Sequence, residues 1–254
     1  PRPMANPQQL ADYCNTLLQA DAFDDYCPNG LQVDAGTAEV RRLISGVTAC
    51  QALIDQAVNR SADLLLVHHG YFWKGEPAEL TGMKGRRVRT LMRHGVSLMA
   101  YHLPLDAHPQ LGNNSQLAIR LGLDGAAPLA GGDGLLWQAD LVQPLTLPVL
   151  TERITAALAR EPLCIVAGST PVRRLGWCSG AAQGYLEQAA AAGLDAFISG
   201  EISEHTVHIA RELGIHYFAV GHHASERFGV QALGRHLADK FALEHEFIDV
   251  PNPV

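Results

Sequence analysis

Histidine and carboxylate side chains gather in three short segments whose residue types and spacing suit metal chemistry. The segments are 68–70 (His-His-Gly), 102–106 (His-Leu-Pro-Leu-Asp) and 222–226 (His-His-Ala-Ser-Glu). The first two directly follow short apolar runs that are typical of buried strands. In parallel α/β sheets, ligand sites collect at the carboxyl ends of strands. We therefore expect imidazoles and carboxylates from distant parts of the chain to converge.

The local spacing sets conditions on this convergence. Neighbouring side chains of a strand point to opposite faces, so His68 and His69 serve one site only if the chain leaves the sheet there, which Gly70 makes easy. If the third segment opens a helix, His222 and Glu226 are four residues apart and share one face. That spacing can hold one metal ion between an imidazole and a carboxylate.

Each segment also has a simpler interpretation when it is taken alone. The histidine pair at 68 and 69 fits a hydrogen-bonded loop, His102 with Asp106 fits a local turn, and His222 with Glu226 fits an ordinary helix pair. The coincidence of three such segments, in a chain with only 18% charged residues, favours metal binding over three separate structural roles.

The types and number of candidate ligands limit which ion could bind and how many ions are expected. Imidazoles and carboxylates without a thiolate suit Zn, Mn, Fe, Co or Ni rather than Ca. The candidate ligands outnumber those of one catalytic zinc, so we expect two divalent ions, whose net positive charge would attract a small anionic substrate such as a phosphate ester or nucleotide. The candidates are His68, His69, Asp106, His222 and Glu226.

An aromatic and a basic segment lie close to the first histidine pair. The aromatic residues 71–73 (Tyr-Phe-Trp) fit packing, but they also lie where a substrate ring could rest. The only concentration of basic residues follows, and it fits a solvated helix face or, alternatively, a phosphate or oligomer contact. It comprises Lys74, Lys84, Arg86, Arg87 and Arg89.

Composition bounds the class of protein. The chain has 254 residues, of which 47% are hydrophobic, so it can bury a sizeable core. The net charge of −7 argues against a general nucleic-acid binder. No apolar run is long enough for a membrane span, and the first residues do not resemble a signal peptide. Five widely spaced cysteines indicate reduced thiols, which together with these features predicts a cytoplasmic protein.

The order of expected elements predicts an α/β fold. Apolar runs at 42–47, 63–67 and 96–101 fit strands, and 49–60 and 86–94 fit helices, so βαβ units and a largely parallel sheet are expected. The second half repeats the first. An offset of 132 residues brings Asp63 onto Asp195, and an offset of 119 brings Gly95 onto Gly214. We expect two related α/β lobes, 1–127 and 128–254, separated by a glycine-rich loop.

The motifs of the chain resemble those of the NIF-three-like family, whose members are often called GTP cyclohydrolase I type 2 homologues. The resemblance covers nearly the whole chain. It is most specific at His-His-Gly (68–70), Leu-Pro-Leu-Asp (103–106) and Gly-His-His-x-x-Glu (221–226), in that order, and it extends to Ile-Ser-Gly-Glu (198–201). The chain is most similar to the short bacterial members, which lack an inserted middle domain.

The resemblance implies two similar three-layer α/β lobes with a dinuclear metal site in the cleft between them, and a toroidal homohexamer. The family's ligand positions match His68, His69, Asp106, His222 and Glu226, and His102 matches a position near the metals.

Two functions follow as hypotheses. The first is a metal-dependent hydrolase of a nucleotide-like or phosphorylated small molecule, in which His102, His223 or Glu201 transfers protons. The alternative is a non-enzymatic ring protein that binds or delivers metal, or docks a partner.

Overall fold

The computed structural model describes residues 4–168 and 170–254, which fold into two compact units. The first unit runs up to Leu105 and is completed by Gly229–Pro251, whereas the second comprises Asp106–Phe228 and Asn252–Val254. The lobes expected from the repeat, 1–127 and 128–254, divide the chain differently. Residues 106–127 pack with the second unit, and the C-terminal segment 229–251 returns to the first because its strand pairs there.

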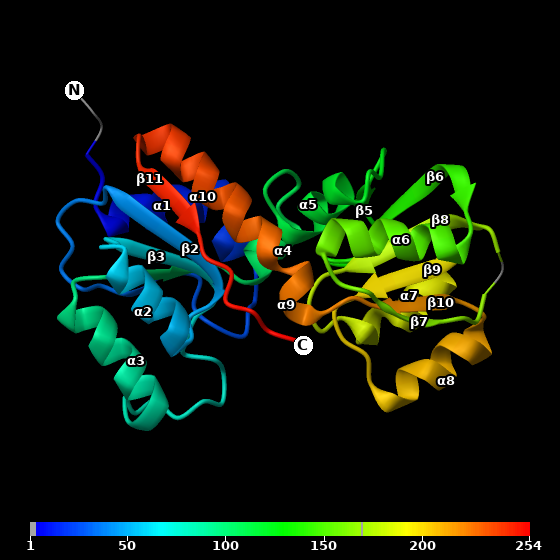
Figure 1. Cartoon of the computed structure of the whole chain (residues 1–254), viewed down its shortest axis with the longest axis horizontal. Helices are drawn as coiled ribbons and strands as arrows, with labels where there is room; N and C mark the ends of the chain where they lie inside the picture. The colour runs from blue at the N-terminus through cyan, green and yellow to red at the C-terminus, as the bar shows by residue number, and fades with distance from the viewer. Residues whose placement is uncertain (1–3, 169) are drawn as a thin grey trace. The chain divides into compact units, whose positions relative to one another are not determined.

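The first unit is built on a sheet of strand order β1-β4-β3-β2-β11 (Figure 1). The pairs β2–β3, β3–β4 and β2–β11 are parallel, as expected for βαβ units, and β1 is antiparallel to β4. The antiparallel edge was not predicted from the sequence. The strands are β1 (Gly30–Val33), β2 (Arg42–Thr48), β3 (Leu64–His69), β4 (Ser97–Ala100) and β11 (Glu244–Phe247).

Helices cover both faces of this sheet (Figure 1). On one face, Leu53 and Leu91 pack with Ile44, Leu65 and other alternate strand residues, which brings α2 and α3 onto the sheet. On the other face lie α1 and α10, so the unit has three layers. The helices are α1 (Pro7–Leu17), η1 (Ala20–Ala22), α2 (Gln51–Asn59), α3 (Gly82–Arg93), α4 (Leu103–Ala107), which continues into the second unit, and α10 (Arg227–Phe241).

The second unit repeats this plan around the order β5-β6-β8-β9-β10-β7. The central strands β8, β9 and β10 are parallel, and β6 and β7 flank them in antiparallel pairing. The strands are β5 (Ala127–Pro128), β6 (Trp137–Leu145), β7 (Leu163–Ile165), β8 (Val172–Cys178), β9 (Ala196–Ser199) and β10 (His216–Ala219).

Alternate residues of these strands again face two helix layers. Trp177 and Ile198 pack with Leu117 and Ile154 of α5 and α6, whereas Phe197 packs on the opposite face with α7 and α8. The helices are α5 (Asn113–Arg120), α6 (Leu147–Leu158), η2 (Gln183–Tyr185), α7 (Leu186–Ala191), α8 (Glu204–Leu213) and α9 (His222–Ser225). The predicted fold class, two similar α/β lobes from an internal repeat, is confirmed.

The repeat is visible in individual hydrogen bonds. One carboxylate oxygen of Asp63 accepts from the backbone N–H groups of Arg41 and Arg42, both at 2.8 Å. Asp195 accepts from the N–H groups of Arg173 and Arg174, at 2.8 and 2.9 Å. Both contacts fix the start of a parallel strand pair, and they fall at the offset of 132 residues.

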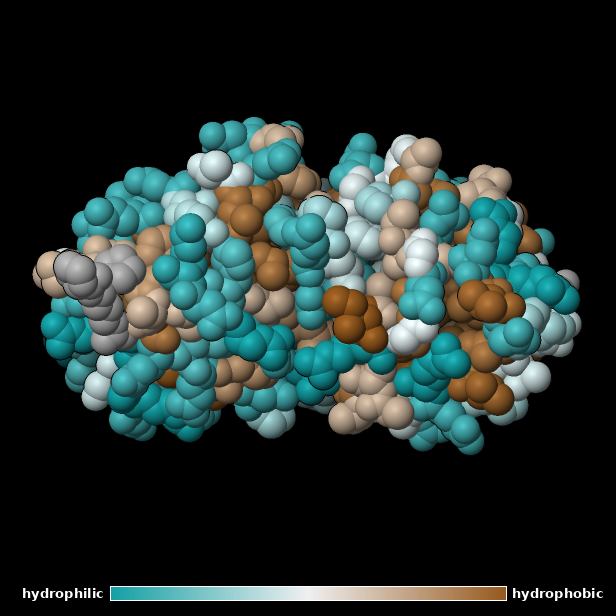
Figure 2. Space-filling model, turned by 90° about the horizontal axis from the view of Figure 1, so that it is seen from above, coloured by the Kyte–Doolittle hydropathy of each residue, from teal (hydrophilic) through white to brown (hydrophobic). Residues whose placement is uncertain are grey.

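The surface view in Figure 2 shows polar residues over much of one face, with apolar residues in separate areas among them. Across residues 4–168 and 170–254, no helix combines the length and the apolarity needed to cross a bilayer. Within the same residues the cysteines are free thiols, and burial raises the pKa of Cys27 to about 12.

Candidate metal-binding site

His68 and His69 lie at the carboxyl end of β3, where the run Leu-Leu-Leu-Val (64–67) forms a fully buried strand. His68 is fully buried, and its Nδ1–H donates to the carbonyl of Tyr101 at 2.7 Å. His69 is the last residue of the strand, opposite Thr48 of β2, whose Oγ1 lies 2.9 Å from the His69 Nδ1. The strand therefore ends just where the sequence required the chain to leave the sheet.

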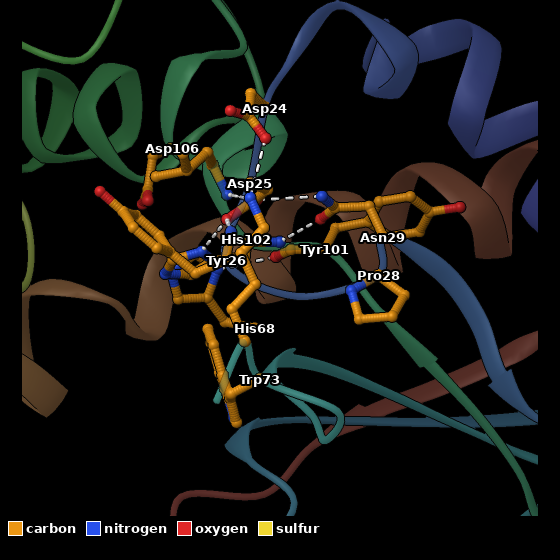
Figure 3. A network of polar contacts seen from close by, with 12 residues as sticks. Asp24, Asp25, Tyr26, Pro28, Asn29, His68, Trp73, Tyr101, His102 and Asp106 are labelled. Atoms are coloured by element: carbon orange, nitrogen blue, oxygen red, sulfur yellow. Dashed lines mark hydrogen bonds and ion pairs between the residues drawn. The ribbon is translucent and has the colours of Figure 1, made fainter. Parts of the chain in front are cut away.

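His102 follows β4, and Asp25 holds its ring (Figure 3). The His102 Nδ1–H donates to Asp25 Oδ1 at 2.7 Å. Asp25 also accepts from Asn29 Nδ2 and from the backbone N–H groups of Tyr26 and Leu103. Burial opposes ionisation of this carboxyl, but the hydrogen bonds from His102 and Asn29 dominate and lower its pKa to about 2. Asp25 is therefore an anion that orients His102.

The three imidazoles of the first unit converge. His68, His69 and His102 each offer a nitrogen within 4.8 Å of the others, the geometry of a metal-ligand cluster. Their ring centroids are 4.7–5.8 Å apart. Asp25 and Cys27 form a second such group with His102.

In the second unit, His222 lies between two carboxylates. His222 Nδ1 is 2.7 Å from Glu201 Oε1, and its Nε2 is 3.0 Å from Glu226 Oε2. Burial lowers the pKa of His222, but Glu226 and Glu201 outweigh it and raise the pKa to about 9. The short helix α9 brings His222 and Glu226 onto one face, as their spacing predicts.

Asp106 is a second buried carboxylate of this unit. It is only 6% exposed, and its Oδ1 accepts from Asn113 Nδ2 at 2.9 Å and from Ser179 Oγ at 3.0 Å. One of its oxygens lies within 4.8 Å of an oxygen of Glu226, which is 2% exposed. Two buried carboxylates at this separation repel each other in a poorly solvated place, which a cation would relieve.

Gly180 makes room for this arrangement. Its φ of +72° favours glycine, and a Cβ there would lie 2.3 Å from Glu226 Oε1 and 3.2 Å from His222 Nε2. Its N–H donates to Ser225 Oγ at 3.0 Å. The loop after β8 therefore fits directly against the imidazole of His222 and the carboxylate of Glu226.

The structure brings the predicted residues together within each unit. His68, His69 and His102 cluster in the first, and Asp106, His222 and Glu226 lie near one another in the second. Their role as metal ligands stays a prediction. Glu201 contacts His222, and the backbone N–H of His223 donates to the carbonyl of Val254. The role of the His223 imidazole stays a prediction.

Asp25 and Thr48 are the residues that sequence reasoning missed. Asp25 comes before a turn-rich segment rather than after a strand, so neither periodicity nor position at a strand end marks it. Thr48 ends β2, and only the register of β2 against β3 brings it to His69.

Comparisons with known proteins agree with this fold. Residues 5–253 match the family model Duf34/NIF3 (NGG1p interacting factor 3). The chain belongs to the Duf34/NIF3 family. Within this family it is 53% identical over 250 residues to a protein of Allochromatium vinosum, covering 98% of each chain, and 54% identical over 246 residues to one of Pseudomonas aeruginosa, covering 96% of this chain and 97% of the relative. Both are named GTP cyclohydrolase 1 type 2 homolog.

A solved structure shares this fold. The protein ybgI is 45% identical to this chain and superposes with a TM-score of 0.92, covering 98% of this chain and 100% of the other. The NIF3 fold is therefore present over essentially the whole chain. The His, Asp and Glu clusters described above supply this NIF3 protein with groups suited to metal binding.

Proposed function

We propose that this protein binds two divalent metal ions, drawn from Zn, Mn, Fe, Co and Ni, and is a metal-dependent hydrolase of a nucleotide-like or phosphorylated small molecule. The proposed ligands are His68, His69, Asp106, His222 and Glu226. The name GTP cyclohydrolase 1 type 2 homolog, carried by relatives about half identical in sequence, agrees with a nucleotide substrate.

One observation carries the proposal: the candidate histidines are all held through Nδ1. The partner is a backbone carbonyl for His68, a hydroxyl for His69 and a carboxylate for His222. Histidines that ligate metals almost always donate their other ring N–H to such groups, which fixes the tautomer and turns Nε2 toward the ion. His102 shares the pattern through Asp25, which supports a place beside the metals.

The carboxylates support the same conclusion. Asp106 and Glu226 are nearly inaccessible to solvent, and each offers an oxygen within 4.8 Å of the other, so one divalent cation could be held by both carboxylates. Bound divalent cations would offset both charges and leave a positive site for an anionic substrate. When bound, such a cation acts as a Lewis acid that polarises the substrate and lowers the pKa of water.

The chain's own residues would manage the protons. Asp25 keeps the His102 Nδ1–H in place, so His102 would exchange a proton through Nε2. Glu201 would hold His222 in its orientation. His223 stays a candidate for proton transfer from the sequence alone.

The same proposal covers location and assembly. We place the protein in the cytoplasm, where the reduced cysteines would persist, and we propose a ring-shaped homohexamer. Size-exclusion chromatography with light scattering measures the assembly, and a mass of one or two chains would contradict the ring.

The central experiment is metal analysis joined to an activity screen. Protein stripped with a chelator is reloaded with each candidate ion, and the bound metal is counted by elemental analysis. We expect about two ions per chain, and hydrolysis of GTP or of other phosphate esters that depends on them. His68→Ala and Glu226→Gln should each lower the metal content and abolish hydrolysis.

A matched control lies in the same unit. His208 and Glu204 form another histidine–glutamate pair four residues apart on a helix, but both side chains are mostly exposed. His208→Ala should leave metal content and activity unchanged. Metal content near zero after reloading with every ion would contradict the metal site. Hydrolysis that survives both His68→Ala and Glu226→Gln would contradict the hydrolase and favour the alternative of a metal-binding or docking protein.

A further inference from the structure

The first unit contains a pocket of about 470 Å³ between the loop that follows β3 and one face of α3. This volume lies within the range of small-molecule sites. Most of its accessible wall is apolar. The residues that matter for recognition are Tyr71, Trp73, Glu76, Met83, Lys84 and Arg87.

The loop that forms one wall is fixed before any ligand arrives. The Gln32 side chain accepts from the N–H of Tyr71 at 2.8 Å and donates to its carbonyl at 3.1 Å. The Tyr71 hydroxyl donates to the carbonyl of Ala49 at 2.6 Å. Phe72 adopts a φ of +64°, which is strained for an aromatic residue and is held by these neighbours. A pocket built on a rigid loop loses little entropy on binding.

Two basic and two acidic side chains line the pocket, and they do not all pair with one another. The Lys84 Nζ forms an ion pair with Glu76 Oε1 at 3.0 Å, and both side chains are mostly buried. Glu76 also accepts from the N–H of Trp73. Glu79 is exposed to solvent. The side chain of Arg87 makes no hydrogen bond or ion pair within the described residues, and its Nε is inaccessible to solvent.

A buried N–H without an acceptor costs free energy, and a guanidinium presents several such donors in one plane. The natural partner for this geometry is a carboxylate or a phosphate, which accepts two parallel hydrogen bonds. Arg87 therefore points to an anionic ligand.

Trp73 links the pocket to the histidine cluster. Trp73 is one of the residues that line the pocket, and Figure 3 shows it in the same group of residues as His102. Its ring centroid is 5.0 Å from that of His102 and 6.0 Å from that of His69. If a flat ring stacked on the pocket side of Trp73, only the indole would separate it from the imidazoles of His102 and His69.

We propose that this pocket binds an organic anion with a flat ring, the ring resting against Trp73 and the anionic group on Arg87. That this ligand is the substrate of the hydrolase rests on the proposed function, whereas binding itself does not. The pocket would select substrates by ring and charge before chemistry takes place at the neighbouring metals.

Calorimetric titration of the full chain, stripped of metal, tests the pocket separately from the metal site. The probes are 2-naphthyl phosphate, 2-naphthoate and neutral 2-naphthol. We expect one saturable site for at least one anion and binding at least tenfold weaker for 2-naphthol. A preference for the phosphate or for the carboxylate assigns the anionic group.

Arg87→Gln should weaken binding of the anion at least tenfold, and Arg87→Lys should weaken it less because the charge remains. Arg86→Gln is the matched control, because Arg86 is the exposed neighbour on α3 and does not line the pocket. Circular dichroism checks that each variant is folded, and Arg87→Lys stands in if Arg87→Gln does not fold. Absence of saturable binding by either anion, or equal affinity in wild type and Arg87→Gln, would overturn the proposal, and the metal analysis would stand unaffected.

Discussion

The two units share one scaffold but end their strands differently. The order β1-β4-β3-β2 in the first matches β7-β10-β9-β8 in the second, with the same directions and an antiparallel edge strand in each. Beyond this block they diverge, because β2 pairs with the parallel strand β11 whereas β8 pairs with the antiparallel β6. The repeated block carries the site residues, and the added strands complete the sheets.

The difference that matters for chemistry lies at corresponding strand ends. Where β3 ends in His68 and His69, the equivalent β9 ends in Ser199, and Gly200 and Glu201 follow. The repeat thus gives imidazoles to the first unit and carboxylates with His222 to the second. The two units thus share their strand order, but the residues at their strand ends offer different candidate metal-ligand groups.

The largest effect should come from the carboxylates that orient a histidine in each unit. Glu201→Gln should weaken metal binding tenfold to a hundredfold, because the proposed ligand His222 loses its anchor, whereas Asp25→Asn should lower the rate of hydrolysis because His102 loses the carboxylate that orients it. Asp25→Asn should also lower the melting temperature, since Asp25 is buried and Glu201 is partly exposed. Competition with a coloured chelator measures the affinity.

Glu204→Gln serves as the control for this pair, because Glu204 pairs with the exposed His208 of the second unit. Unchanged metal affinity in Glu201→Gln and unchanged hydrolysis in Asp25→Asn would show that these carboxylates serve folding alone.

An intermediate effect should follow from the shared aspartates. Asp63→Ala and Asp195→Ala each remove a carboxylate that accepts two backbone N–H groups, so each should lower the free energy of unfolding by about 1–2 kcal/mol. Urea denaturation measures the change, and the exposed Asp124→Ala should have little effect. If only one of the two variants lowered the free energy of unfolding, the equivalent hydrogen bonds would not contribute equally to stability.

The smallest effect concerns β11, a strand of the first unit that has no parallel counterpart in the second. Burial and the positive charge of Arg235 lower the pKa of His245 to about 4, against the opposing effect of Glu246. The unfolded chain takes up this proton near pH 6.5, so the stability that His245 contributes is complete above that pH and is lost as the pH falls toward 4.

Between pH 7 and pH 5.5, the free energy of unfolding of the wild type should therefore fall by about 1 kcal/mol more than that of His245→Asn. Urea denaturation at both pH values tests this, with the exposed His94→Asn as control. The same pH dependence in wild type and His245→Asn would show that His245 is not the group responsible.

The sequence predicted the elements whose apolar runs are long. The strand predicted at 63–67 corresponds to β3, the helix at 49–60 to α2 and the run at 96–101 to β4, because buried parallel strands consist almost entirely of apolar residues. The edge strands β1 and β7 are short, and β1 begins at a glycine within a turn-rich segment, so local pattern did not reveal them.

For the candidate site, the types and spacing of the residues predicted which side chains come together, but the sequence did not predict which other residues hydrogen-bond to them. The spacing of His222 and Glu226 anticipated their 3.0 Å contact. The contacts of Asp25 with His102 and of Thr48 with His69 join residues 77 and 21 positions apart, and such pairings depend on tertiary structure.

The path of the chain through the two units has a consequence for synthesis. A ribosome releases Asp106–Phe228 of the second unit before it releases β11, which follows that segment in the chain and pairs with β2. Until then the edge of β2 that β11 will cover has no partner from this segment, and exposed strand edges invite association with other chains. Because β11 is made after the second unit, it protects an edge of the first unit only once the second has been synthesised.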